Sequence, residues 1–174
     1  MVRVFDVARP WQDLAVRFHA EHRFHGSEQA VIALLSDPAF YLELVLPDLS
    51  QPSVLEQHDD ADQVVLRLRY EFEGSLDPIA DRLIGSSRLA WIQEVRVNRS
   101  ESSGALRFEA EKDPRRLHGA ADFVLTADGV GSARSIDGEL IVAVPGIGRM
   151  AERRIVPGLL RRLDIEAQAI NDQL

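Results

Sequence analysis

Cysteine is absent from the 174 residues, so the chain has no disulfide bonds and no thiol nucleophile. No stretch approaches the roughly 20 apolar residues that span a bilayer, and the N-terminus lacks the apolar core of a signal peptide. Lys and Arg number 20 against 28 Asp and Glu, which gives a net charge of −8. Because phosphate binding needs clustered positive charge, this balance disfavours a nucleic-acid partner. We expect a cytoplasmic protein without an integral membrane segment.

Length and composition favour one domain. A chain of 174 residues lies within the usual size of one domain and is short for two. Its 45% hydrophobic content is enough to fill a sizeable core. No internal repeat or low-complexity tract interrupts it. We expect a single domain over residues 1–174, in which residues 1–14 form an N-terminal extension.

Most of the chain shows the period-2 alternation of half-buried strands. Residues 15–24 alternate apolar and polar, and two short helices follow, the first with Ser27 as N-cap and the second with Asp37 as N-cap and Pro38 in its first turn. A hairpin is then expected within residues 53–74, a helical turn within 75–85, and four more strands within 87–144. Strands at this spacing with few intervening helices predict an antiparallel meander.

Residues 145–174 form the only segment that reads as a long amphipathic helix. Its apolar positions form two arcs, one ending near Ile155 and one beginning near Leu159. Continuing the first arc along the helix leads to the polar residues Arg162 and Glu166. The two arcs therefore cannot form one continuous apolar stripe on a straight helix. Because an interior proline removes a helical hydrogen bond, we predict a kink or short break at Pro157.

Three segments carry a resemblance to known proteins: RFHAEHRFHGS in the first strand, DPAFY at residues 37–41, and GELIVAVPGIGRMAE leading into the last helix. Together with the element order, they resemble the SRPBCC superfamily of START and birch-pollen-allergen proteins, and most closely an actinobacterial domain of unknown function, number 2505. The resemblance implies an α+β helix-grip fold. In that fold a curved antiparallel sheet of six or seven strands wraps around a long C-terminal helix, with two short helices after the first main strand. Members bind lipids, sterols, polyketides or plant hormones, and some are cyclases or dehydratases.

A cavity between such a sheet and helix would be lined by the inward faces of both. The candidate ligand-binding residues are Phe18, His22, Tyr70, Trp91, Gln93, Phe108, Phe123, Met150 and Ile155. His22 reads as a core histidine with one hydrogen bond or, alternatively, as a polar anchor in the cavity. Gln93 is an amide on an apolar strand face, although a register shift of one residue would turn Glu94 inward instead.

Two catalytic or metal interpretations are disfavoured. His19, His22 and His25 are spaced as HxxHxxH, but on a strand His22 points away from the other two, so the three cannot converge on a zinc ion without a bulge or a helical turn. Ser, His and Asp occur without a GxSxG elbow. We therefore assign no catalytic residue, metal or cofactor.

Three functions remain open. The first is binding of a small, largely apolar molecule such as a lipid, a polyketide or a similar metabolite; the 6% aromatic content weakly favours an aliphatic ligand. The second is a cyclase or dehydratase that uses the same cavity, with His22 or a carboxylate moving a proton. The third is a protein-interaction module whose core is filled. A monomer or a homodimer fits each of them.

Overall fold

The computed structural model describes residues 15–74, 89–143 and 148–174, without the side chains of residues 148–154. Within these ranges seven antiparallel strands form one sheet in the order β1-β7-β6-β5-β4-β3-β2. The strands are β1 (Ala15–Phe24), β2 (Ser53–Asp59), β3 (Gln63–Glu71), β4 (Ala90–Asn98), β5 (Ser103–Ala110), β6 (Leu117–Asp128) and β7 (Gly131–Val142). The helices are α1 (Glu28–Leu35), α2 (Pro38–Glu43) and α4 (Gly148–Gln173). The predicted α+β helix-grip architecture is confirmed.

Local sequence signals account for the short helices. The Ser27 side chain accepts a hydrogen bond from the Ala30 amide at 3.3 Å, and Asp37 accepts one from the Ala39 amide at 2.8 Å. Pro38 occupies the first turn of α2, where its missing N–H leaves no bond unmade. Both predicted caps are therefore confirmed, and they fix where the chain leaves β1 and begins to cover one end of the sheet.

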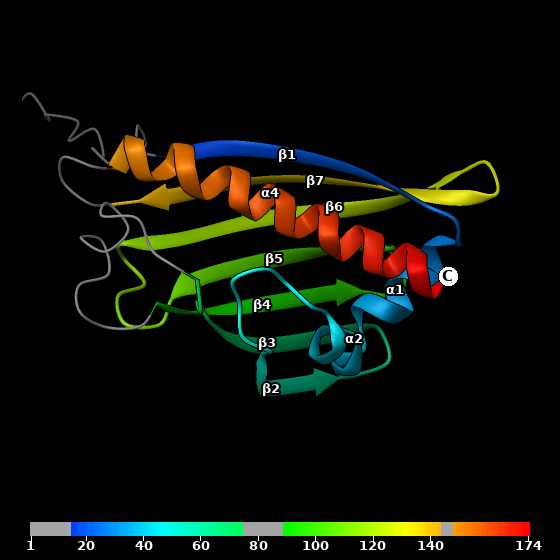
Figure 1. Cartoon of the computed structure of the whole chain (residues 1–174). Helices are drawn as coiled ribbons and strands as arrows, with labels where there is room; N and C mark the ends of the chain where they lie inside the picture. The colour runs from blue at the N-terminus through cyan, green and yellow to red at the C-terminus, as the bar shows by residue number, and fades with distance from the viewer. Residues whose placement is uncertain (1–14, 75–88, 144–147) are drawn as a thin grey trace, which may run out of the picture.

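The sheet curves around α4, which runs across its concave face with its C-terminal end beside α1 (Figure 1). α4 packs chiefly against β1 and β7. These two strands pair with each other although they begin and end the strand sequence, so the meander closes with its first and last strands side by side. The concave face and the inner side of α4 enclose the main hydrophobic core.

Glycines on the concave face make room for phenylalanine rings from neighbouring strands. A Cβ atom at Gly119 would overlap the Phe108 ring, and a Cβ atom at Gly138 would lie 2.5 Å from the Phe18 ring. The three opposed pairs are Gly104 with Phe123, Gly119 with Phe108, and Gly138 with Phe18. A ring that lies over a glycine covers its bare backbone and supports strand curvature, so these pairs shape the inner wall.

The sequence predicts a kink or a short break at Pro157, and the short break is wrong, because α4 is one uninterrupted helix from Gly148 to Gln173 with Pro157 inside it. The break was expected because the inward stripe reaches Arg162 and Glu166. The structure instead buries Glu166 in an ion pair with Arg134 of β7. A strand thus supplies the counter-charge, so the inward side of the helix carries Glu166 without a break in the helix.

Some expectations fall outside the described residues. They are the N-terminal extension at residues 1–14, the helical turn expected within 75–85, and the entry to the last helix at 144–147. No helix in the described ranges is long and apolar enough to cross a membrane.

Candidate functional site

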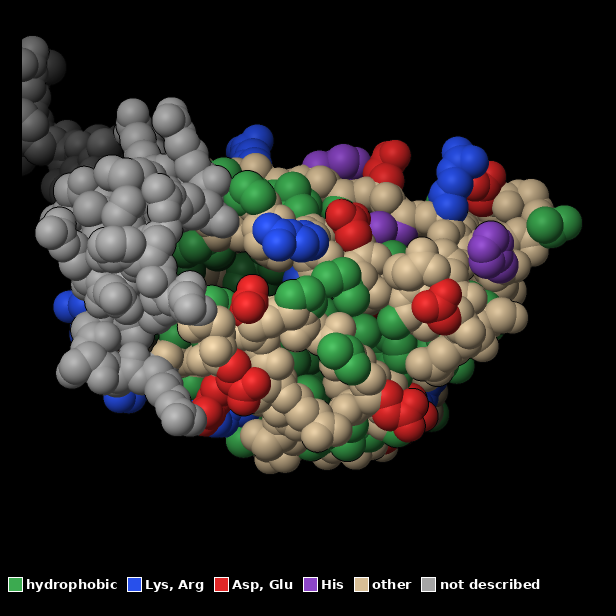
Figure 2. Space-filling model, viewed as in Figure 1, with side chains coloured by type: hydrophobic (Ala, Val, Ile, Leu, Met, Phe, Trp, Pro, Cys, Tyr) green, Lys and Arg blue, Asp and Glu red, His purple; other side chains and the backbone are tan. Residues whose placement is uncertain are grey.

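A cavity of about 300 Å³ lies between α4, the central strands of the sheet and the loop after α2. Its walls are mostly apolar. The helix contributes Ile155, Leu159 and Ile165, the sheet contributes Trp91, Phe108 and Leu140, and the loop contributes Leu46 and Leu49. Figure 2 shows hydrophobic side chains at the bottom of a hollow beside the exposed side chains of the helix. A concave, mainly apolar space with a few polar groups is the usual make-up of a small-molecule site.

Four charged residues also line the cavity, and they differ in position. Asp48 and Arg161 are exposed. Glu109 forms an ion pair with Arg67 at 4.0 Å, on a strand position that also faces the outer side of the sheet. Arg162 is the exception, because its Nη2 atom is fully buried and has no hydrogen-bond partner among the described residues.

Aromatic rings hold the Arg162 side chain. Its guanidinium carbon lies 4.5 Å from the centroid of the Tyr70 ring, and Tyr70 stacks on Trp91 with ring centroids 5.8 Å apart. The cation over a ring face is attracted by the ring quadrupole. Burial raises the pKa of the Tyr70 hydroxyl, while the Arg162 charge opposes that rise. The Arg162 side chain also approaches the Tyr70 hydroxyl closely enough to lower its pKa, but the geometry is not that of a hydrogen bond. The buried Tyr70 hydroxyl and Arg162 Nη2 therefore both lack a hydrogen-bond partner among the described residues.

Eight of the nine residues proposed from sequence separate into three groups. Trp91, Phe108 and Ile155 lie in the cavity wall. Phe18, Tyr70, Gln93 and Phe123 point inward but are buried in the core next to it. The Met150 side chain lies outside the described residues. Gln93 is 4% exposed while Glu94 lies on the outer face, so the register that turned Glu94 inward is wrong.

His22 belongs to an ionic cluster, buried except for the exposed Asp164, rather than to the cavity wall. Its Nδ1 atom lies 3.2 Å from Arg134 Nη2, and its Nε2 atom lies 3.1 Å from Asp164 Oδ1. Arg134 also pairs with Glu166, Nη1 to Oε1, at 2.7 Å, and its guanidinium carbon lies 5.5 Å from the centroid of the Phe24 ring. Arg134 and Glu166 are each only 2% exposed. The cluster therefore ties β1, β7 and α4 together through buried charge.

The geometry of this cluster determines the protonation of His22. A guanidinium only donates hydrogen bonds, so His22 Nδ1 accepts from Arg134 and Nε2–H donates to Asp164. A proton on Nδ1 would face a second donor. Burial and then the Arg134 charge lower the pKa of His22, against the opposite influence of Asp164 and Glu166. His22 is thus a neutral, structurally engaged histidine, whereas His19 and His25 are exposed.

Sequence reasoning missed Arg134, Glu166 and Arg162. A usable signal existed for Arg134, which occupies an inward position of β7 between Ser132 and Ile136. Glu166 likewise lies among the apolar residues of α4. An inward arginine on a strand together with an inward glutamate on the covering helix would have predicted their pairing.

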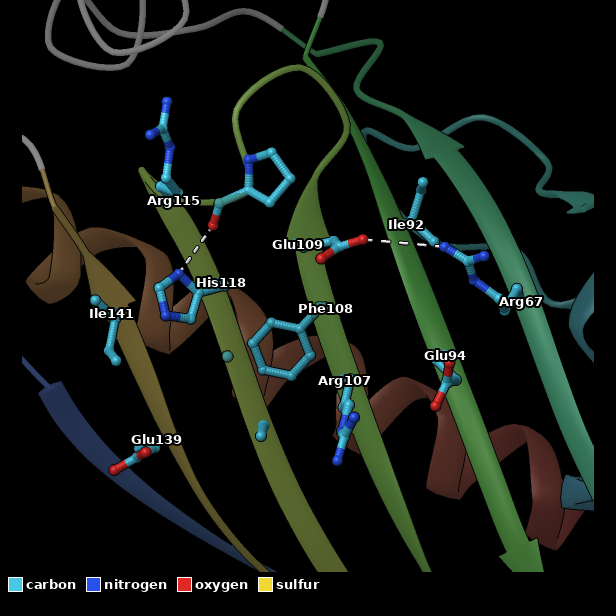
Figure 3. A pocket seen from close by; sticks show the side chains of 13 residues that line it. Arg67, Ile92, Glu94, Arg107, Phe108, Glu109, Arg115, His118, Glu139 and Ile141 are labelled. Carbon is cyan, nitrogen blue, oxygen red and sulfur yellow. Dashed lines mark hydrogen bonds and ion pairs between the residues drawn. The ribbon is translucent and has the colours of Figure 1, made fainter.

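The outer face of the sheet carries a different pocket. It has a volume of about 490 Å³ and lies over β3 to β7, with α4 behind the sheet (Figure 3). Charged side chains of both signs dominate it: Arg67, Arg107, Arg115, Glu94, Glu109 and Glu139. His118 Nδ1 lies 2.9 Å from the Pro114 carbonyl oxygen. Because opposite charges are interspersed and largely exposed there, this surface behaves as a solvated sheet face.

Comparison with known proteins supports the fold assignment. Residues 19–174 match the model of the family described as "Protein of unknown function (DUF2505)". No match was found among curated proteins.

Solved structures with this fold share little sequence with the chain. The Zhui aromatase/cyclase from Streptomyces sp. R1128 has a TM-score of 0.63 at 12% identity, with 91% of this chain and 93% of that chain covered. The protein TTHA0849 from Thermus thermophilus has a TM-score of 0.62 at 12% identity, covering 90% and 95%. A START superfamily protein from Mycobacterium smegmatis has a TM-score of 0.52 at 15% identity, covering 91% and 95%. At such identities the likeness establishes the fold alone.

Proposed function

The chain belongs to the DUF2505 family and has the helix-grip fold of START-like proteins, and on this basis we propose that it binds a small, largely apolar ligand in the cavity beneath α4. The observation that carries the proposal is the cavity itself, about 300 Å³ bounded by apolar side chains of helix and sheet. Protein interiors are otherwise close-packed, with few voids larger than a water molecule. A space of this size, at the lower end of ligand pockets, suits a compact lipid, polyketide or similar metabolite.

The two other hypotheses have less support. An enzyme that uses His22 as its acid or base needs that side chain to reach the ligand, but His22 is engaged by Arg134 and Asp164 and is absent from the cavity wall. Of the two carboxylates that line the cavity, Asp48 is exposed and Glu109 is paired with Arg67, so neither is isolated in an apolar setting as an acid or base. The name of the aromatase/cyclase describes that neighbour, and a shared fold does not transfer its chemistry. A filled-core interaction module leaves the cavity volume unexplained.

Native mass spectrometry of the purified full chain tests the proposal first. We expect an added mass near a one-to-one ratio, and extraction followed by identification gives its chemical class. The protein is also incubated with mixed lipids and with aromatic and aliphatic metabolites, in case the ligand is lost during purification. A mass that stays that of the bare chain under all these conditions contradicts ligand binding.

Two substitutions at Gly158 locate the binding site. Gly158 lies in the cavity wall, and a Cβ atom there meets no other atom within 4 Å. Gly158→Phe is expected to occupy part of the cavity and reduce ligand binding. Gly158→Ala is the control, because it also replaces the glycine with a better helix former but adds no bulk. Equal ligand occupancy in both variants would place the ligand elsewhere.

A further inference from the structure

Arg162 is the only cavity-wall cation with a fully buried nitrogen that lacks a partner among the described residues. Leaving a charged donor buried without an acceptor is unfavourable, so a structure that retains one raises the question of what satisfies it. The two carboxylates that line the cavity do not satisfy the Arg162 nitrogen. Asp48 is exposed, and Glu109 pairs with Arg67.

Neighbouring side chains hold the guanidinium in place. It lies over the Tyr70 ring at 4.5 Å, and the Tyr70–Trp91 stack fixes that ring. Glu166, one helical turn further along α4, pairs with Arg134 at 2.7 Å and forms no ion pair with Arg162. The cation is therefore preorganised at the apolar cavity, and its own helix supplies no free carboxylate at that turn.

We propose that Arg162 binds the carboxylate of the ligand, so that the preferred ligand is a compact apolar monocarboxylic acid. This inference rests on the proposed binding function and specifies its ligand class. A planar guanidinium matches a carboxylate through paired, charge-assisted hydrogen bonds, whereas an alcohol of the same shape offers one neutral acceptor. The apolar wall formed by Trp91, Phe108 and Ile155 accommodates the rest of the molecule.

Matched ligand pairs test the proposal on the full chain. Octyl, decyl, dodecyl and naphthyl bodies are each supplied as the carboxylic acid and as the alcohol, below micelle-forming concentrations, and binding is followed by calorimetry. For the best-fitting body we expect the acid to bind about 10- to 100-fold more tightly than the alcohol. An acid-to-alcohol ratio near one, with the alcohol bound, overturns the carboxylate inference and leaves apolar binding standing. Failure of every pair to bind overturns both.

Substitutions assign the preference to Arg162. In Arg162→Met the acid-to-alcohol ratio is expected to fall close to one, while affinity for the alcohol changes little. Arg107→Met is the matched control, since Arg107 is exposed on the outer face and its loss changes the net charge equally. A ratio that survives Arg162→Met, or falls equally in Arg107→Met, overturns the assignment.

A second variant covers the case in which Arg162→Met does not fold. Arg162→Lys keeps the charge but lacks the forked donors, so the ratio is expected to fall several-fold without loss of alcohol binding. Circular dichroism and the unfolding midpoint verify that each variant is folded before binding is compared. An unchanged ratio in a folded Arg162→Lys protein contradicts paired recognition of the carboxylate.

Discussion

Substituting Glu166 by leucine should destabilise the fold strongly, because it leaves Arg134 buried without its carboxylate. Arg134 is 2% exposed, and Glu166 accepts its Nη1 hydrogen bond at 2.7 Å. The remaining contacts are His22 Nδ1 at 3.2 Å and the face of the Phe24 ring. Arg134 Nε already lacks a partner among the described residues, so the site has little capacity to compensate for the loss.

The expected loss in free energy of unfolding for Glu166→Leu is about 3–5 kcal/mol, the usual result of removing one member of a buried ion pair. Proteins of this size are stable by roughly 5–15 kcal/mol, so the variant should remain measurable at low temperature. Removing both charges, in Arg134→Met with Glu166→Leu, leaves no unpaired ion. The double variant should lose only about 1–3 kcal/mol, mainly because His22 Nδ1 loses its donor.

Urea denaturation at pH 7, followed by circular dichroism, gives the four free energies of this double-mutant cycle. The reasoning requires that the double variant be more stable than Glu166→Leu alone. A loss below about 1 kcal/mol in Glu166→Leu, or a double variant whose loss equals the sum of the single losses, would refute it. If Glu166→Leu does not fold, the cycle is built with Glu166→Gln instead, which retains an acceptor oxygen, in both the single variant and the double variant with Arg134→Met.

Two further predictions concern the histidine and the inner wall. Because the folded-state pKa of His22 is lowered, its contribution to stability is fully present above about pH 6.5 and is lost as pH falls through the lowered value. His22→Asn keeps an acceptor but cannot be protonated, so its free energy of unfolding, measured by urea denaturation, should not show this loss below about pH 6.5. Parallel pH profiles of stability for the wild type and His22→Asn would contradict the prediction. Gly119→Ala should reduce the free energy of unfolding by about 1–3 kcal/mol, because its Cβ overlaps the Phe108 ring. Gly158→Ala, in open space on α4, should instead stabilise by about 0.5–1 kcal/mol, and an equal effect of both substitutions would contradict the packing argument.

Much of the element order follows from local patterns in the sequence. The alternation around Phe18 and Tyr70 predicts strands whose inward residues the structure buries, and Ser27 and Asp37 begin helices where their side chains can cap them. Gln93 takes the inward position expected from its neighbours Val95 and Val97. These features depend on residues within a few positions of one another, so sequence alone can specify them.

The candidate site is less accessible from sequence because it depends on which inward residues meet across the fold. Trp91, Phe108 and Ile155 come from two strands and a helix, and only their packing leaves a cavity between them. Inward orientation did not distinguish them from Phe123 or Phe18, which fill the core beside the cavity. Filled and unfilled space have the same period-2 pattern in a sequence.

The sequence by itself determined the strand and helix pattern, the caps and the family, because each rests on local residue order. Only the tertiary structure determined which partners the inward-facing charged residues have. Glu166 and Arg162 interrupt the apolar stripe of α4, and for that reason the sequence predicted a kink or short break at Pro157. In the fold, Glu166 pairs with Arg134, which lies 32 positions away in the sequence. Arg162 instead packs against the face of the Tyr70 ring beside the cavity. The cost of burying a charge depends on whether a partner compensates for lost solvation, and the tertiary structure determines which residues are close enough to be partners.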